Sequence, residues 1–399
     1  MLQYVYVKRG IIMQLQFDIS KQYALALAGG GARGAYEVGV WNALVQAGLS
    51  FNAVSGTSIG AMNAAFVATN ELERARQIWL NLTYSEVMEG DPVIINKLSK
   101  KDFANLDLKK TLDFVIQTIR SKGLDITPMK DTMRKVINEE AVKSSSIDYY
   151  IVTCSVDDLK EIEVRAKDLE DGELYDMLLA SAYLPVFRNE PLRGKRYLDG
   201  GFMDVLPVHV LVENGYKDII GVSCNAVGYK RPVDPPVDVN IWEVAPRVSV
   251  GTVLEFDPKQ SAENLKTGYF DGMRLLYGLQ GNKYYIDRTY TEETAYALMV
   301  TYIREYLKAT GGNASLREIN ERILPKIAFR ANALGKDYYD IFISAVEIAA
   351  AEAGIDLYRI YTEDELIPEV LSHYPASEGA LPKGLQFRLQ ALLGLERSE

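Results

Sequence analysis

The sequence predicts an α/β fold with a mostly parallel central sheet, and two observations carry that prediction. Short apolar runs at residues 23–28 and 51–55 are typical of strands buried on both faces. Each run is followed by a helical segment, at residues 32–47 and 58–69. Strand–helix–strand–helix order implies right-handed crossovers, which make neighbouring strands parallel. With 399 residues, the chain is long enough for one large α/β domain with an appendage, or for two to three smaller domains.

The remaining elements follow in chain order. Residues 1–22 alternate weakly and predict an N-terminal extension, either a strand or an ordered arm. Residues 72–138 are mostly helical and more polar. Within them, residues 106–120 carry an apolar stripe, which fits a helix packed on the domain but also a lid or a lipid-facing helix. Both interpretations stay open at this point.

The alternation then resumes. Strands are predicted at 149–155, 161–165, 196–198 and 219–223, a helix at 172–182, and a proline-rich loop at 228–240. Helical spacing returns at 292–309 and 337–353. Ser315 with Glu318, and Thr362 with Glu365, have the spacing of helix capping boxes. We therefore expect an α/β domain over 23–275 and a helical C-terminal region over 276–399.

Composition excludes some functions. A net charge of −10 repels nucleic acid and gives no general attraction to anionic membranes, so any peripheral membrane contact would be local and apolar. Cys154 and Cys224 lie in apolar runs and are expected to be buried free thiols. The apolar run at 11–13 is too short for a signal peptide, and no run is long enough for a transmembrane helix, which favours the cytoplasm. Met1 and Met13 are both candidate start residues.

The glycine cluster Gly29-Gly-Gly-Ala-Arg-Gly34 follows a strand and opens a helix. It matches the dinucleotide fingerprint G-x-G-x-x-G, but the second strand ends Val54-Ser55-Gly56 without the carboxylate that would hold a ribose. The other interpretation is an oxyanion hole, because glycines let backbone N–H groups approach a developing negative charge. Arg33 then either orients the loop, touches a charged head group or forms a structural salt bridge.

Ser58 lies in Gly56-Thr-Ser-Ile-Gly60 between a strand and a helix, which is the context of a nucleophile elbow, although a serine N-cap fits the same position. Of the two histidines, His209 lies in a helical run and His373 lies in the C-terminal region. Neither follows a strand end. Asp199, in Asp199-Gly-Gly201, does. An ordinary aspartate is a weak base, but burial in an apolar cleft would make it competent.

In this order, the three motifs resemble those of the patatin-like phospholipases, and Ser181-Ala-Tyr-Leu-Pro-Val-Phe187 resembles the family's stretch before the aspartate strand. The resemblance covers about residues 23–225. It implies a three-layer α/β/α sandwich, a Ser58–Asp199 dyad without histidine, and no metal or cofactor. The implied substrates are lipid acyl esters: phospholipids, galactolipids or neutral glycerides. Asp204 departs from the family, in which many members carry an amide residue there.

The resemblance also assigns supporting roles. The oxyanion hole would be formed by the backbone of Gly29, Gly30, Gly31, Ala32, Arg33 and Gly34, the nucleophile elbow by Gly56, Thr57, Ile59 and Gly60, and the aspartate turn by Gly200 and Gly201. The leading hypothesis is a lipid acyl hydrolase. The alternatives are an acyltransferase that uses the same acyl-enzyme, and a non-catalytic or nucleotide-binding module. The sequence does not predict an oligomeric state.

Overall fold

The computed structural model describes residues 5–8, 11–90, 123–158, 160–309 and 311–373. The chain divides into two compact units, residues 1–276 and 277–399. Our interpretation of the stripe at 106–120 lies outside the described residues. In the described part of the chain, no helix combines the length and apolarity needed to cross a membrane.

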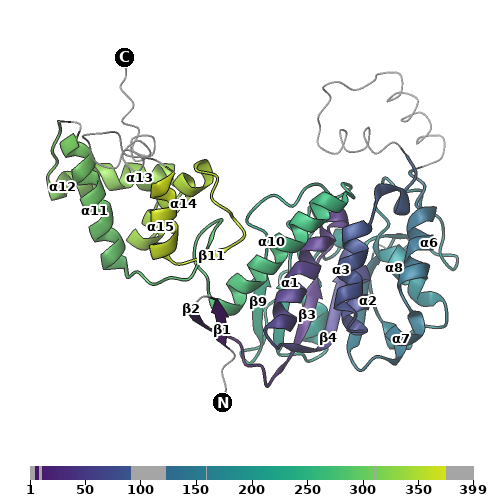
Figure 1. Cartoon of the computed structure of the whole chain (residues 1–399). Coiled ribbons are helices and arrows are strands. Elements are labelled where there is room, and N and C mark those ends of the chain that lie inside the picture. The colour runs from purple at the N-terminus through teal and green to yellow at the C-terminus, as the bar shows by residue number, and fades with distance from the viewer. Residues whose placement is uncertain (1–4, 9–10, 91–122, 159, 310, 374–399) are drawn as a thin grey trace, which may run out of the picture. The chain divides into compact units, whose positions relative to one another are not determined.

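A seven-stranded sheet forms the centre of the first unit (Figure 1). Its order is β6-β5-β4-β3-β8-β9, with β7 also paired to β5. The parallel strands are β3 (Gln22–Leu27), β4 (Ser50–Thr57), β5 (Asp148–Ser155), β8 (Asp218–Val222) and β9 (Asn240–Val244). Both β6 (Lys160–Arg165) and β7 (Tyr197–Asp199) run antiparallel to β5. The predicted mostly parallel sheet is confirmed.

Helices cover both faces of the sheet. In Figure 1, α1 (Gly34–Gln46), α2 (Ile59–Ala68) and α3 (Leu72–Asn81) lie in front of it. On the other face, α9 (Val208–Glu213) packs its apolar side chains against Ala24, Ala26 and Ala28 at the end of β3. The long helix α10 (Pro258–Tyr277) packs directly on α1, where a Cβ at Gly268 would lie 2.0 Å from the Tyr36 carbonyl oxygen. The result is the expected three-layer sandwich.

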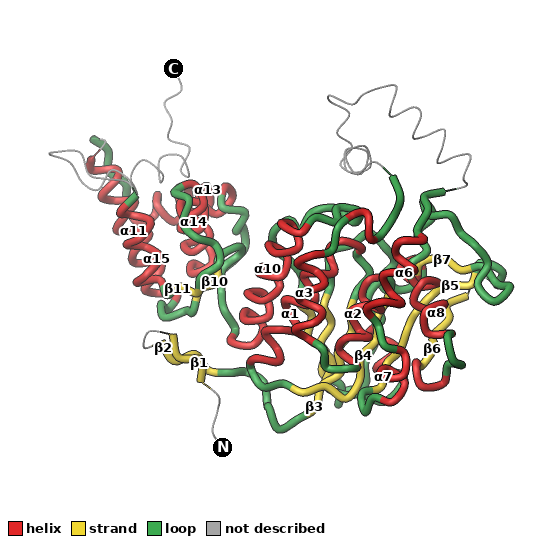
Figure 2. The backbone as a smooth tube through the Cα atoms, turned by 45° about the vertical axis from the view of Figure 1, so that its right-hand side comes forward, coloured by secondary structure: helices red, strands yellow, loops and turns green. Residues whose placement is uncertain are grey.

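The other elements of this unit are shorter. An antiparallel hairpin of β1 (Val5–Lys8) and β2 (Ile11–Gln14) forms the N-terminal extension. Beyond α3 come α6 (Thr127–Val136), α7 (Glu139–Ser144) and α8 (Glu173–Ser181), which lie toward the β6 end of the sheet (Figure 2). Cys154 and Cys224 are buried and free, as predicted.

The second unit is mainly helical. It contains α11 (Glu292–Ala309), α12 (Leu316–Glu318), a π-helical turn (Ile319–Ile323), α13 (Leu324–Arg330), α14 (Tyr338–Glu352) and α15 (Glu363–Ser372), with a short parallel pair of β10 (Tyr285–Ile286) and β11 (Ile360–Tyr361). Both bonds of the Thr362–Glu365 capping box form. The Ser315 side chain accepts a hydrogen bond from the Glu318 N–H. The pair β10–β11 was not predicted.

Candidate active site

The three sequence motifs meet at one edge of the sheet. Since β3 and β4 are parallel neighbours, the loop after β3 lies beside the residue that follows β4. A Cβ added at Gly29 would lie 3.4 Å from the Ser58 Cβ. Strand β7 brings the third motif, because Asp199 pairs with Thr153 of β5. A Cβ at Gly200 would lie 2.9 Å from the Thr57 side chain.

Ser58 has the strained backbone of an elbow. Its φ is 55° and its ψ is −124°, outside the helical region, and its side chain makes no capping hydrogen bond to α2. Ser58 therefore occupies the N-cap position without acting as a hydroxyl cap. The flanking glycines are required by packing: a Cβ at Gly56 would lie 2.4 Å from the Gly60 carbonyl oxygen, and one at Gly60 would lie 2.4 Å from the Leu27 carbonyl oxygen.

Ser181 supports this elbow, a role that the sequence analysis missed. The backbone N–H of Ser58 donates to the Ser181 hydroxyl at 2.7 Å, and that hydroxyl donates to the Val152 carbonyl at 2.6 Å. Both bonds are buried. The available signal was the position of Ser181 at the start of the family-like stretch, which by itself indicates no contact with Ser58.

Asp199 is almost fully buried, with 4% of its surface exposed. Its Oδ1 accepts a hydrogen bond from the Gly201 N–H at 2.8 Å. Its Oδ2 is buried and makes no hydrogen bond within the described chain. Burial raises the pKa of Asp199 to about 6, and the neighbouring Ser58 hydroxyl and the Gly201 N–H partly oppose that rise. The carboxylate therefore has the basicity that the sequence analysis required of it.

Two backbone N–H groups of the glycine loop have no acceptor among the described residues. Gly29 donates to the Val205 carbonyl, Ala32 to the Val253 carbonyl, Arg33 to the Gly30 carbonyl and Gly34 to the Gly31 carbonyl. Among the described residues, the N–H groups of Gly30 and Gly31 donate to no acceptor. Gly31 has φ +55°, and a Cβ there would lie 2.1 Å from the Val253 oxygen, so only glycine fits.

Arg33 orients this loop. Its guanidinium donates to the backbone carbonyls of Gly251 at 3.0 Å, Asn225 at 2.8 Å and Cys224 at 3.3 Å. Within the described chain no ion pair involves Arg33, so the salt-bridge interpretation is wrong for these residues. Its donors hold the loop against the segment that follows β8.

An apolar pocket begins at the residue after the serine. It has about 540 Å³ of space, its open mouth included. The lining is almost entirely apolar and comes mainly from α2, α3 and α6, with Ile59, Met62, Phe66, Trp79, Met129, Met133 and Phe256 among its residues. Its chemistry matches a hydrocarbon chain rather than a polar ligand.

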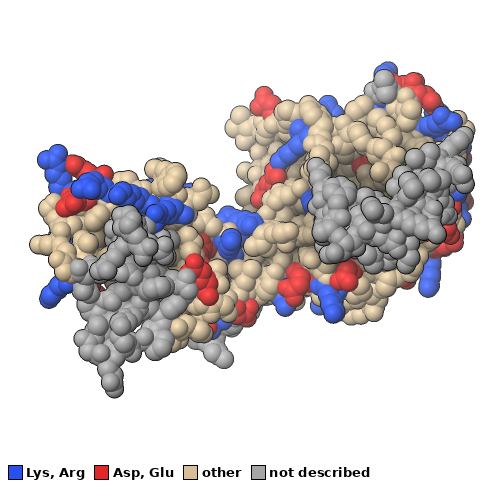
Figure 3. All heavy atoms as spheres, turned by 90° about the horizontal axis from the view of Figure 1, so that it is seen from above, with Lys and Arg blue, Asp and Glu red and all other residues tan. Residues whose placement is uncertain are grey.

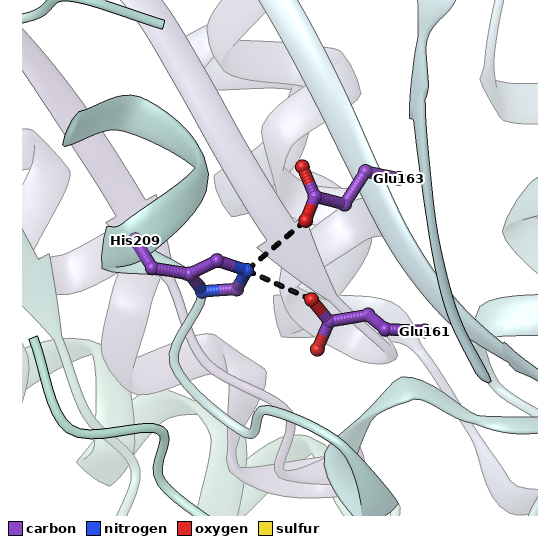
Figure 4. A group of neighbouring side chains, drawn as sticks. All are labelled: Glu161, Glu163 and His209. Carbon is purple, nitrogen blue, oxygen red and sulfur yellow. Dashed lines mark hydrogen bonds and ion pairs between the residues drawn. The ribbon is translucent and has the colours of Figure 1, made fainter. Parts of the chain in front are cut away.

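His209 is held away from the site by carboxylates. Its Nδ1 contacts Asp204 at 2.7 Å. Its Nε2 contacts Glu161 at 2.8 Å and Glu163 at 3.2 Å, as Figure 4 shows. Strand alternation places both glutamates on one face of β6. Burial lowers the pKa of His209, but the bonds to the three carboxylates outweigh it and raise the pKa to about 11. His209 is therefore a charged structural residue.

The same cluster has the residue types of a metal site. Ligand atoms of Glu161, Glu163 and His209 lie within 4.8 Å of one another. However, a protonated His209 donates to both glutamates, and Arg231 donates to Glu161 at 3.2 Å. The two glutamates are therefore already paired with cations, so we assign no metal. The other histidine, His373, ends α15, where its Nδ1 lies 2.9 Å from the Glu369 carbonyl oxygen.

The first unit is similar in sequence to known proteins. The family model for patatin-like phospholipases matches residues 25–212, and this part of the chain belongs to that family. Patatin-like phospholipase domain-containing protein 7 of Rattus norvegicus is 25% identical over 210 residues, which are 50% of this chain and 13% of that protein. Lysophospholipase NTE1 of Cryptococcus neoformans is 27% identical over 237 residues, 56% of this chain and 12% of that protein.

The chain thus spans only about an eighth of the length of these curated relatives. Among solved structures, VipD from Legionella pneumophila aligns with a TM-score of 0.40 and 13% identity, covering 97% of this chain and 93% of VipD.

Proposed function

We propose that the chain hydrolyses the acyl ester bonds of lipids through a Ser58–Asp199 dyad and an oxyanion hole in the glycine loop. One observation carries the proposal: a buried aspartate with a pKa of about 6 lies beside a serine on a strained elbow, next to two free backbone donors. Membership of residues 25–212 in the patatin-like phospholipase family supports the same chemistry.

Each step uses groups of this site. Asp199 takes the hydroxyl proton as Ser58 Oγ attacks the acyl carbon. The oxygen of the tetrahedral intermediate accepts hydrogen bonds from the N–H groups of Gly30 and Gly31. The carbon–oxygen ester bond breaks, and the proton on Asp199 passes to the departing alcohol. Asp199 then deprotonates a water that attacks the acyl carbon of the acyl-enzyme. The bond between that carbon and Ser58 Oγ breaks, and the proton on Asp199 passes to Oγ, which releases the fatty acid and restores both residues.

The apolar pocket supports a lipid acyl chain as the group transferred. It starts at Ile59, directly after the nucleophile, and its lining offers few polar groups. Burial of apolar surface stabilises a bound chain by about 0.8 kcal/mol per methylene. We expect kcat/KM to rise with acyl length until the pocket is filled. Met133→Trp narrows the pocket and should move the preferred chain length downward.

The test is hydrolysis of a medium-chain p-nitrophenyl ester together with fluorophosphonate labelling. Wild type should turn over and label, Ser58→Ala should do neither, and Asp199→Asn should lose turnover. His209→Gln is the matched control for loss of a buried polar group outside the site, and it should keep both activities. Fatty acid should be released even with added glycerol; glyceride formation would instead indicate acyl transfer. A wild type that neither turns over nor labels would refute the proposal.

A further inference from the structure

One buried acid near the site has no role in the mechanism above. Glu37 lies in the first turn of α1 and is fully buried. Its Oε2 accepts a hydrogen bond from the Asn63 side chain at 2.8 Å. Its Oε1 is buried and makes no hydrogen bond within the described chain. A charged carboxylate in such a position would be costly, because burial outweighs the neutral groups that favour the charge, namely the Asn63 amide, the Cys224 thiol and the Ala28 backbone.

Glu37 is linked to the C-terminal end of the glycine loop. Besides binding Glu37, the side-chain nitrogen of Asn63 donates to the Gly34 carbonyl at 2.9 Å, and its oxygen accepts from the Trp79 indole at 3.0 Å. Asn63 belongs to α2, the helix that begins directly after Ser58. The Glu37–Asn63 pair therefore joins the loop that offers the oxyanion donors to the helix that carries the nucleophile.

The other end of the loop is linked through Cys224. The thiol of Cys224 faces the Glu37 carboxyl group. The thiol lowers the pKa of Glu37, and the carboxyl group raises the pKa of Cys224. The Cys224 Cβ would lie 2.8 Å from a Cβ at Gly30, so this residue packs directly against the loop backbone. Glu37 thus lies between the two ends of the loop whose Gly30 and Gly31 N–H groups donate to no acceptor among the described residues.

The groups around Glu37 favour its neutral form. From α2 it accepts a hydrogen bond from the uncharged Asn63, which in turn accepts a hydrogen bond from the Trp79 indole of α3. Burial raises the pKa of Cys224 well above its usual range, so the thiol is also uncharged. Burial raises the pKa of Glu37 itself to about 8. The nearby charged groups are engaged elsewhere: Arg33 binds backbone carbonyls, and on α10 Asp271 accepts from Tyr36 and Arg274.

We propose that Glu37 is a positioning residue that, as a neutral carboxylic acid, fixes the glycine loop against the nucleophile helix. The proposal rests on the proposed function of the loop as an oxyanion hole. Ionisation of Glu37 would place an uncompensated charge beneath the loop. The charge would draw in water or donors from Asn63 and displace Gly34 and Gly30. The oxyanion donors would then lose their alignment.

The test compares wild type with Glu37→Gln, Glu37→Ala and the exposed control Glu73→Gln on α3. The first readout is kcat between pH 6 and 10, corrected for background hydrolysis with Ser58→Ala. Wild type and Glu73→Gln should lose activity above about pH 8, by about tenfold per pH unit. Glu37→Gln should retain its kcat to a pH about one unit or more higher than wild type does, because the amide cannot ionise. Glu37→Ala should lose kcat at every pH, and recovery of kcat by the Gln variant is the rescue expected of a positioning residue.

The second readout is urea unfolding of the full chain from pH 4 to 9, which needs no activity. A folded-state pKa above the unfolded value means that the folded protein binds the extra proton between about pH 4.5 and 8. In that window, the folding equilibrium constant of wild type should fall about tenfold per pH unit relative to Glu37→Gln. Above the window the difference should stay constant.

The two readouts separate the outcomes. If wild type and Glu37→Gln lose activity at the same alkaline pH and show the same pH dependence of stability, Glu37 is not a neutral buried acid and the proposal is wrong. A stability difference with coincident activity limbs would leave Glu37 purely structural and would overturn its positioning role. If no protein turns over at any pH, the proposed function fails and the positioning role fails with it, while the stability difference still reports the buried acid.

Discussion

Replacing Asp199 by asparagine should make the protein inactive and more stable at neutral pH. Holding the Asp199 proton to a pKa of about 6 instead of 3.8 corresponds to about 3 kcal/mol of unfavourable free energy when the group is ionised. Only 4% of the Asp199 surface is exposed, so solvent screening removes little of this cost. Asparagine keeps the acceptor for the Gly201 N–H and carries no charge.

The sign of the pH dependence follows from the direction of that pKa change. The folded protein binds more protons than the unfolded chain between about pH 3.8 and 6, so wild-type stability declines as pH rises through this window. Asp199→Asn should therefore be more stable than wild type by up to about 3 kcal/mol at pH 7, and equally stable near pH 3.5. The exposed Asp157→Asn is the matched control and should show no such difference.

The same pKa governs catalysis. Wild-type kcat should fall by about tenfold between pH 7 and pH 5, because the protonated aspartate cannot accept the Ser58 proton. Urea unfolding measures the stability, and a stopped p-nitrophenyl ester assay, read after alkalinisation, measures the rate. A wild-type rate that stays flat down to pH 4.5, or an Asp199→Asn variant without added stability at pH 7, would refute burial as the source of the basicity.

Three further predictions follow from contacts in the first unit and one control in the second. Gly60→Ala should cost about 1–3 kcal/mol in urea unfolding, because its Cβ would lie 2.4 Å from a carbonyl oxygen of β3, whereas Gly312→Ala, with its nearest atom at 3.5 Å, should cost less than about 0.5. Ser181→Ala leaves the buried N–H of Ser58 without an acceptor, so kcat should fall about ten- to hundredfold with KM unchanged. An unaltered kcat would contradict the supporting role of Ser181. His209→Gln should lower stability by at least about 2 kcal/mol in thermal or urea unfolding, yet turnover per folded molecule should persist, and its loss would implicate the histidine in catalysis.

The parts of the site that were predictable from sequence are those fixed by strand ends. Periodicity located the strands that precede Gly29, Ser58 and Asp199. Because β3 and β4 are parallel neighbours, the loop after β3 and the residue after β4 had to lie at the same edge of the sheet. Asp199 reaches that edge differently, because β7 runs antiparallel to β5 and places Asp199 opposite Thr153. The fold class followed from the same alternation of strands and helices.

The parts that were not predictable depend on contacts between distant segments. Glu161 and Glu163 precede His209 by 48 and 46 residues, and in the sequence they belong to an ordinary amphipathic strand. Only the antiparallel placement of β6 at the sheet edge brings their carboxylates to the histidine. The contacts of Ser181 and Glu37 were likewise not predictable, because a buried hydrogen bond between distant segments leaves no spacing pattern in the chain.

Burial explains how Asp199, rather than either of the two histidines, can act as the base for Ser58. A serine needs a base whose pKa lies near the working pH, and histidine usually supplies it without perturbation. Here His209 is bound to three carboxylates and stays protonated, so it has no free nitrogen to accept a proton. Asp199 reaches a pKa of about 6 by desolvation instead, and the same desolvation leaves its Oδ2 free to accept from Ser58. Opening the site to water should therefore lower both the pKa of Asp199 and the activity. The pKa of a buried histidine base would instead rise on exposure to water.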